Sequence, residues 1–191
     1  MRIFGIDPGS RRTGYGCVER AGSRHVLVIC GSLSGPPRAT FPDRLNAIHD
    51  GLKALILRHR PDCVAVEDIF HARNVRSALK LGEARGVALL AASEAGVPVV
   101  SYAPAAVKRA VVGYGRAEKH QVQQMVKLLL GLAEPPTPHD VADALAIALC
   151  HLQSSIGAIP DEMRKDAVKP PLSLRSWRQF RPLTTSSLMV L

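Results

Sequence analysis

The chain has 191 residues, of which 47% are apolar, and its formal net charge is +9. This length allows one domain with a sizeable core and argues against two. No apolar run reaches the roughly 18 residues that a membrane span needs, so no membrane partner is expected. A basic chain without a membrane signal most often binds nucleic acid, although a merely basic surface is the alternative.

The spacing of the apolar residues predicts one α/β domain over residues 1–155. In chain order it predicts strands over 2–7, 13–19 and 24–33, a helix over 42–59, a strand over 63–67, a helix over 75–94, a strand over 97–102, and helices over 104–112, 117–131 and 139–154. Short links join the first three strands, as in an antiparallel meander. Three strands followed by alternating helices and strands indicate a five-stranded mixed sheet with helices on both faces.

Residues 156–191 differ in composition from the predicted domain. They contain four prolines and six Lys or Arg against three Asp or Glu, and they show no sustained apolar period. We expect a disordered, basic C-terminal tail. The alternative is a partner-binding segment that would use Trp177 and Phe180.

The N-terminus and the cysteines bear on where the protein works. Met1-Arg2 leads straight into an apolar strand, which does not resemble a signal peptide. The four cysteines lie in separate apolar segments without a C-x-x-C pair. Free thiols in a reducing cytoplasm are therefore expected.

Four carboxylates stand where they could form one acidic cluster. Asp7 and Glu67 each end an apolar strand, and Asp140 and Asp143 lie three residues apart at the start of the last apolar helix. An acid at a buried strand end is costly to desolvate without a partner, and residues at i and i+3 share a helical face. Mg²⁺ could neutralise such a cluster, because it takes carboxylate oxygens and keeps water and phosphate ligands. Two ions about 4 Å apart could activate a water and stabilise the leaving oxygen in phosphodiester hydrolysis.

Three of these acids also have a purely structural interpretation. Asp7 precedes a Pro-Gly turn and could hydrogen-bond the turn backbone. Glu67 could pair with a nearby arginine. Thr137-Pro138-His139-Asp140 fits a helix N-cap with Pro at the first helical position, so Asp140 could be a capping residue. Asp143 has no such explanation, because it lies one turn into an apolar helix.

A series of short motifs follows in a characteristic order: Gly5-Ile6-Asp7-Pro8-Gly9-Ser10, Thr13-Gly14-Tyr15-Gly16, Ser77-Ala78-Leu79-Lys80-Leu81-Gly82, Ala84-Arg85-Gly86-Val87-Ala88, Val111-Val112-Gly113 and Ala142-Asp143-Ala144-Leu145-Ala146-Ile147-Ala148. Together they resemble the RuvC family of bacterial crossover junction endodeoxyribonucleases, from residue 1 to about residue 152. The resemblance implies an RNase H-like fold, a homodimer, and Mg²⁺-dependent resolution of Holliday junctions by paired symmetric nicks in recombination and DNA repair. Two Mg²⁺ ions per site are expected, with Mn²⁺ as a substitute. The implied partners are four-way junction DNA and the RuvA–RuvB branch-migration complex.

The resemblance also gives roles to individual residues. Asp7, Glu67, Asp140 and Asp143 correspond to the catalytic, metal-binding acids of the family. The remaining correspondences concern DNA: Phe70 matches an aromatic wedge near the crossover, and Lys108 and Lys119 match basic positions that contact DNA. Phe70 could instead anchor its loop to the core.

Several further residues have two interpretations each. Arg73, Arg76 and Lys80 are spaced to contact phosphates, or they form a solvated helix face. His139 could join the metal shell or act on the leaving group. Gly82 and Gly86 form a smooth helical stripe, which the resemblance assigns to the dimer interface; packing on the chain's own sheet is the alternative.

Three other functions are alternatives to a resolvase. An RNase H-like nuclease of the YqgF type, acting on RNA, would lack Phe70 and the motif at 77–82. A sugar-kinase or actin-like ATPase would need a duplicated domain and a second phosphate loop, for which this chain is too short. A non-catalytic junction-binding module predicts loss of at least one acid, whereas all four are present.

Overall fold

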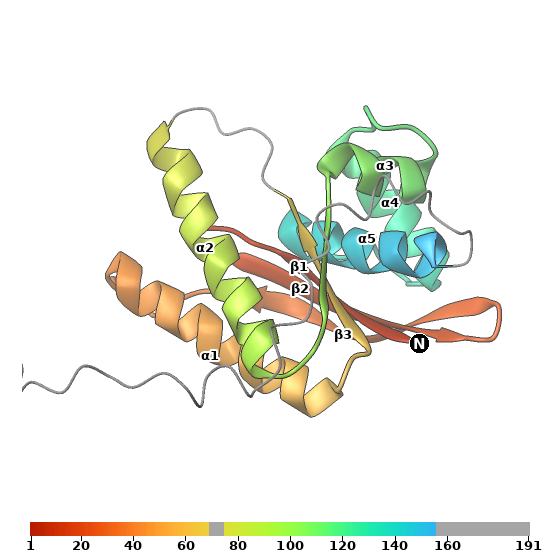
Figure 1. Ribbon diagram of the computed structural model, residues 1–191. Helices are drawn as coiled ribbons and strands as arrows, with labels where there is room; N and C mark the ends of the chain where they lie inside the picture. The colour runs from red at the N-terminus through yellow and green to blue at the C-terminus, as the bar shows by residue number, and fades with distance from the viewer. Residues whose placement is uncertain (69–74, 156–191) are drawn as a thin grey trace, which may run out of the picture.

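One mixed sheet of five strands organises the computed structural model, which describes residues 1–68 and 75–155. The strands are β1 (Arg2–Asp7), β2 (Thr13–Ala21), β3 (Arg24–Leu33), β4 (Cys63–Glu67) and β5 (Val99–Tyr102), in the order β3-β2-β1-β4-β5. The first three strands form an antiparallel meander, and β4 and β5 run parallel to β1 (Figure 1). The predicted five-stranded mixed sheet is confirmed.

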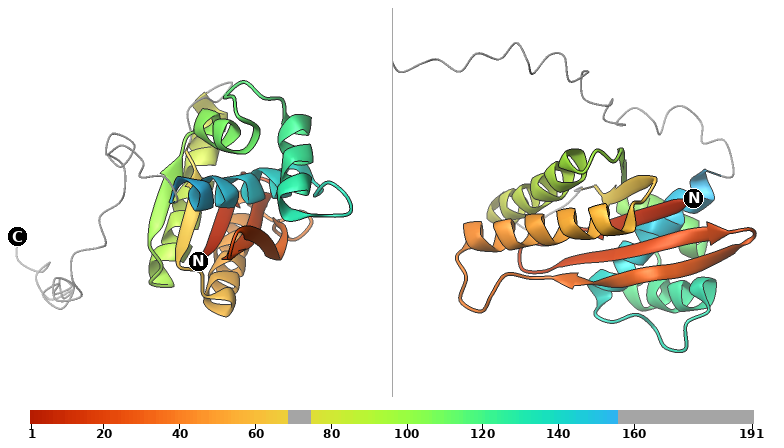
Figure 2. Two further views of the ribbon diagram at one scale, coloured as in Figure 1. Left: turned by 90° about the vertical axis from the view of Figure 1, so that its right-hand side faces the viewer. Right: turned by 90° about the horizontal axis from the view of Figure 1, so that it is seen from below.

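Helices cover both faces of this sheet, as predicted. They are α1 (Phe41–His59), α2 (Val75–Glu94), α3 (Pro104–Val112), α4 (Lys119–Leu130) and α5 (His139–Ser154). One face is covered by α1 and α2, and the other by α3, α4 and α5 (Figures 1 and 2). Burial of apolar side chains therefore forms two cores, one on each side of the sheet.

The predicted element boundaries are correct to within about two residues. The start of α5 differs from the predicted capping pattern, because its N-cap is Pro138 and no side chain caps the helix. The proposed capping arrangement around Thr137 and Asp140 is therefore wrong. Asp140 lies in the first turn of α5 without serving as its cap.

Small residues allow α5 to lie directly on the central strands. A Cβ on Gly5 of β1 would collide with the carbonyl oxygen of Ala144, and a Cβ on Gly14 of β2 would collide with that of Asp140. Gly14 is also the register partner of Asp7 across the β1–β2 ladder. The glycine at this position thus brings the start of α5 against the end of β1.

The cysteines, the helices and the C-terminal residues bear on the other expectations from the sequence. All four cysteines are free, with Cys17, Cys63 and Cys150 buried. Within residues 1–68 and 75–155, no helix is long and apolar enough to cross a bilayer. The predicted tail, 156–191, lies outside the described residues.

Candidate active site

Two of the predicted acids meet at the carboxyl ends of neighbouring parallel strands. Ile6 of β1 is in register with Val66 of β4, so Asp7 and Glu67 follow at adjacent positions. Their side chains point to the face covered by α5, because Ile6 and Val66 point into the core on the α1–α2 side. The carboxyl groups of Asp7 and Glu67 are close enough for each to affect the pKa of the other.

The other two acids come from the first turns of α5. Asp140 is held against β2 by the close contact at Gly14. Asp143 is only partly buried, although its neighbours Ala142 and Ala144 are fully enclosed. Helix geometry puts residues at i and i+3 on one face, so both carboxylates face the ends of β1 and β4.

The charges of these acids affect one another's ionisation. Burial, followed by the charges of Glu67, Asp143 and Asp140, raises the pKa of Asp7 from 3.8 to about 8. Burial and the charge of Asp143 also raise the pKa of Glu67. The cluster carries more negative charge than it can hold fully ionised without a cation.

Lysines supply part of the missing positive charge. Lys119 Nζ, at the first residue of α4, lies 3.1 Å from Asp143 Oδ2. Burial opposes the charged form of Lys119, but Asp143, Asp7 and Asp140 together raise its pKa. Lys119 lowers the pKa of Asp7 and Glu67, and Lys108 of α3 lowers that of Glu67. Both lysines that the sequence assigned to DNA contact therefore lie beside the acids.

The donor set suits a hard divalent cation, since all four side chains offer carboxylate oxygens and two of them resist ionisation in its absence. In the described part of the chain, however, no three His, Cys, Asp or Glu side chains already form a ligand cage. The acids are neighbours that repel one another, and Asp143 is drawn toward Lys119.

Among residues 1–68 and 75–155, no hydrogen bond of Asp7 to the turn backbone and no ion pair of Glu67 with an arginine supports the structural explanations. The turn after β1 is fastened by Thr13, whose hydroxyl donates to Gly9 O at 3.2 Å and accepts from Gly9 N at 3.4 Å. Arg85 reaches the end of β4, but it contacts the backbone carbonyl of Glu67 and the side chain of Asp68. Neither Thr13 nor Arg85 was identified from the sequence; their only signal is their place inside the ordered motifs.

The remaining predicted residues are distributed around this cluster. Arg76 is exposed on the first turn of α2, and Lys80 places Nζ 5.4 Å from the centroid of the Phe41 ring, in a cation–π contact with α1. His139 is exposed at the first residue of α5. Phe70 and Arg73 lie outside the described residues.

Gly82 and Gly86 lie on an open side of α2. In the described part of the chain, a Cβ added to either glycine would meet no atom within 4 Å beyond the backbone of α2 itself. Their packing on the chain's own sheet, the alternative considered from the sequence, is therefore wrong.

The family model for "Crossover junction endodeoxyribonuclease RuvC" matches residues 3–151. The chain belongs to the RuvC family. It is 54% identical to the RuvC of Chloroflexus aggregans over 151 residues, which cover 79% of this chain and 92% of that protein. The RuvC structure of Thermus thermophilus superposes with a TM-score of 0.74 at 42% identity, covering 82% of this chain and 96% of that one. The same protein in complex with a Holliday junction substrate also gives a TM-score of 0.74. The RNase H-like fold expected for a RuvC is thus confirmed.

One RuvC relative corrects an expectation about the C-terminal residues. The RuvC of Trichlorobacter lovleyi is 50% identical over 185 residues, which cover 95% of this chain and all of that protein. An alignment of this length extends past residue 155. The expectation that the similarity ends near residue 152 is wrong for this RuvC.

Proposed function

We propose that this chain is a Holliday junction resolvase, a metal-dependent endonuclease that makes paired symmetric nicks across a four-way DNA junction during recombination and repair. The observation that carries the proposal is the cluster of Asp7, Glu67, Asp140 and Asp143, with Lys119 and Lys108 beside it. Membership of the RuvC family supports the substrate class.

The four acids would hold Mg²⁺, with two ions per site and Mn²⁺ as a substitute. When bound, the metal would polarise the scissile phosphate and lower the pKa of a bound water. The chain's own residues would orient the ligands: β1 and β4 fix two carboxylates at adjacent strand ends, and α5 presents the other two across from them. His139, exposed beside Asp140, could contribute from the rim of the site.

The basic residues would hold the DNA near this cluster. Lys108 and Lys119 lie next to the acids and would contact the phosphates that flank the cut. Arg76 and Lys80, in the first turns of α2, would also contact the junction. Arg73 and the Phe70 wedge, which precede α2 in the sequence, would act on it as well.

The resolvase would be a homodimer formed through α2, because two cuts need two active sites. Val75, Leu79 and Leu90 are 76%, 62% and 51% exposed and follow one side of α2 together with Gly82 and Gly86. Exposed apolar side chains next to open glycines suit close contact with a second copy. The further partners in the cytoplasm would be RuvA and RuvB.

The test is cleavage of a synthetic four-way junction with Mg²⁺, beside a linear duplex and an RNA of the same sequence. Paired symmetric nicks in the junction alone, lost in Asp7→Asn, would support the resolvase. Cleavage of RNA would favour the YqgF-type nuclease. Tight junction binding without cleavage under any divalent ion would indicate a non-catalytic module.

A further inference from the structure

Arg85 of α2 fastens the end of β4 from the side of the sheet opposite the acids. Its Nε donates to the backbone carbonyl of Glu67 at 3.2 Å, and its Nη2 donates to Ser101 Oγ at 2.7 Å. Nη2 also lies 3.3 Å from Asp68 Oδ1. One guanidinium therefore joins α2 to the last residues of β4 and to β5.

The direction of these contacts matters for the position of the Glu67 side chain. Glu67 points toward α5, whereas Asp68 points toward α2, because side chains alternate along the strand. Arg85 holds the peptide between them and leaves the Glu67 carboxylate free to face the cluster. The backbone N–H of Asp68 donates to Tyr102 O at 2.8 Å, so β5 restrains the same strand end.

Such a restraint is needed because the acids repel one another. Burial and the charge of Asp143 act against ionised Glu67. A strand end without a firm attachment could relieve this repulsion by moving away, and a ligand must stay within about 0.5 Å of its productive position. The Arg85 side chain is only 22% exposed, so its hydrogen bonds and ion pair are largely sheltered from competing water.

We propose that Arg85 is a positioning residue, which holds the β4 end so that the Glu67 carboxylate can bind the catalytic metal. The proposal rests on the metal-dependent function given above and adds a residue outside the acidic cluster. The competing explanation is that Arg85 merely braces α2 against the sheet. A positioning role predicts that Arg85→Gln binds metal more weakly than a control variant with the same loss of stability. A brace predicts that the two variants bind metal equally well.

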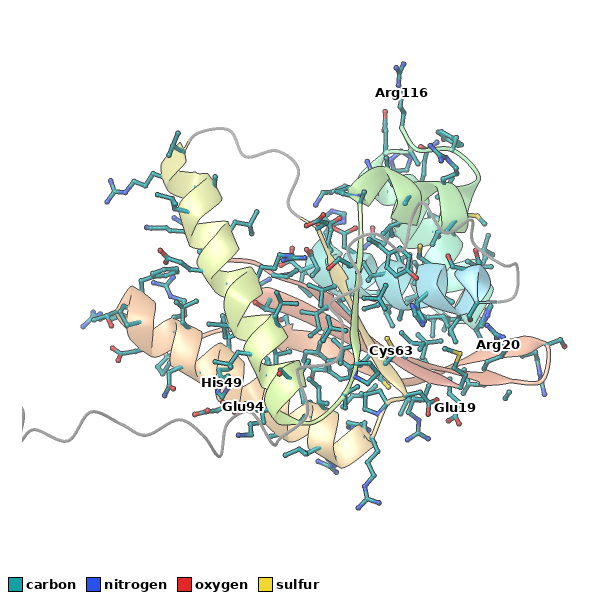
Figure 3. The ribbon with its side chains drawn as sticks, viewed as in Figure 1. Glu19, Arg20, His49, Cys63, Glu94 and Arg116 are labelled. Carbon is teal, nitrogen blue, oxygen red and sulfur yellow. The ribbon has the colours of Figure 1, made fainter. Side chains whose placement is uncertain are left out.

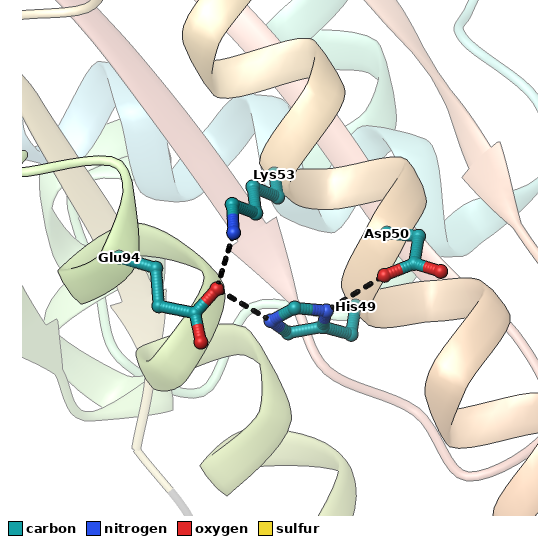
Figure 4. A network of polar contacts seen from close by, with 4 residues as sticks. All are labelled: His49, Asp50, Lys53 and Glu94. Carbon is teal, nitrogen blue, oxygen red and sulfur yellow. Dashed lines mark hydrogen bonds and ion pairs between the residues drawn. The ribbon is translucent and has the colours of Figure 1, made fainter.

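A matched control exists on the same helix. Glu94, in the last turn of α2, accepts from Lys53 Nζ at 2.6 Å and lies 3.3 Å from His49 Nε2, so it also joins α2 to another element (Figure 4). In Figure 3, His49 and Glu94 lie in the α1–α2 layer, away from the α3–α4 connection that carries Arg116. Glu94→Gln weakens the attachment of α2 without touching β4.

The experiment compares full-length wild type with Arg85→Gln, Arg85→Lys and Glu94→Gln. Mn²⁺ binding without DNA is followed by electron paramagnetic resonance, thermal stability by melting, junction binding in EDTA by fluorescence anisotropy, and cleavage by Mg²⁺ titration.

Loss of a residue that orients a metal ligand typically weakens metal affinity by about 10- to 100-fold. Arg85→Gln should show this weakening, a lower kcat and unchanged junction binding. Arg85→Lys should lie between it and wild type, because an ammonium lacks the planar fork.

The outcomes separate the explanations. Wild-type Mn²⁺ affinity in Arg85→Gln, with a fall in Tm like that of Glu94→Gln, would overturn the proposal in favour of a brace. If Arg85→Gln does not fold, Ser101→Ala serves instead, since it removes the shortest hydrogen bond of Arg85 and should weaken Mn²⁺ binding in the same direction. If wild type binds Mn²⁺ but does not cut junctions, the proposed function fails while the metal-affinity comparison still decides the role of Arg85.

Discussion

Lys119 Nζ lies 3.1 Å from Asp143 Oδ2, so a lysine that the sequence assigned to DNA contact is paired with an acid of the cluster. The lysine side chain is 65% exposed and that of Asp143 is 22% exposed. The cation therefore reaches in from the surface to a partly sheltered carboxylate. It reduces the repulsion among the acids and remains within reach of a phosphate at the rim.

Removal of this charge should alter the pH at which the acids bind metal. Lys119 lowers the pKa of both Asp7 and Glu67. In Lys119→Met both pKa values should rise, so carboxylate ionisation and Mn²⁺ binding should require a higher pH than in wild type. Mn²⁺ titrations over a range of pH would measure the shift, with Lys127→Met near the other end of α4 as the control. An unchanged pH midpoint would contradict the coupling.

Charge reversal at the second lysine should reveal the DNA-binding side of the cluster. Lys108→Glu should weaken junction binding and flatten its dependence on salt, because fewer counterions are released for each lost phosphate contact. Loss of one contact should lower the slope of log affinity against log salt by about one, or about two if the new carboxylate also repels a phosphate. Anisotropy titrations at several salt concentrations would measure this. Equal slopes for variant and wild type would place the DNA elsewhere.

Asp143→Asn should separate binding from cleavage. The amide is isosteric and removes one ligand charge, so the junction should bind as in wild type while the single-turnover cleavage rate falls. A drop of at least about 100-fold is expected, since loss of an outer partner of a metal ligand already costs 10- to 100-fold. Retained cleavage would remove Asp143 from the metal site.

The metal-free protein should become less stable as the pH rises. The pKa of Asp7 is about 8 in the folded chain and 3.8 for the free side chain, mainly because of burial. Between these values the folded chain binds more protons than the unfolded chain, so the free energy of unfolding falls with rising pH. Asp7→Asn should remove much of this slope, and its gain in Tm should grow with pH and be largest at about pH 8 and above. Melting curves in EDTA would test it, and parallel slopes for the two proteins would refute it.

A bulky residue on the open side of α2 should weaken the dimer without lowering the stability of the subunit. Leucine at Gly86 has free space within the subunit and is a better helix former than glycine by roughly 1 kcal/mol. Overpacking of a close interface costs about 1–3 kcal/mol, which corresponds to a roughly 5- to 150-fold weaker dimer. Sedimentation velocity would measure Gly86→Leu against Arg58→Leu on the exposed side of α1. An unaffected dimer would exclude this face.

Much of the fold could be predicted because it depends on local patterns. The continuous apolar runs of β1 and β4 and the helical period of α1 are repeated in the observed burial, which is continuous in both strands and periodic in the helix. The start of α5 was predicted less well, since Thr137 and Asp140 fit a local capping pattern that the packing of α5 on Gly14 does not use. At this helix end, a side-chain cap would stabilise the fold less than the burial of the helix against the sheet does.

The sequence by itself determined which residue types the site contains and where the strands end. Asp7, Glu67 and Asp143 stand out because an acid beside apolar residues is costly without a function. Tertiary structure decided which residues lie beside these acids. It did so through the parallel pairing of β1 with β4, the ion pair of Lys119 with Asp143, and the hydrogen bond of Arg85 to the backbone carbonyl of Glu67. The physical reason is that these contacts join residues 18 to 60 positions apart, and the direction of a side chain across such a gap depends on how the layers pack.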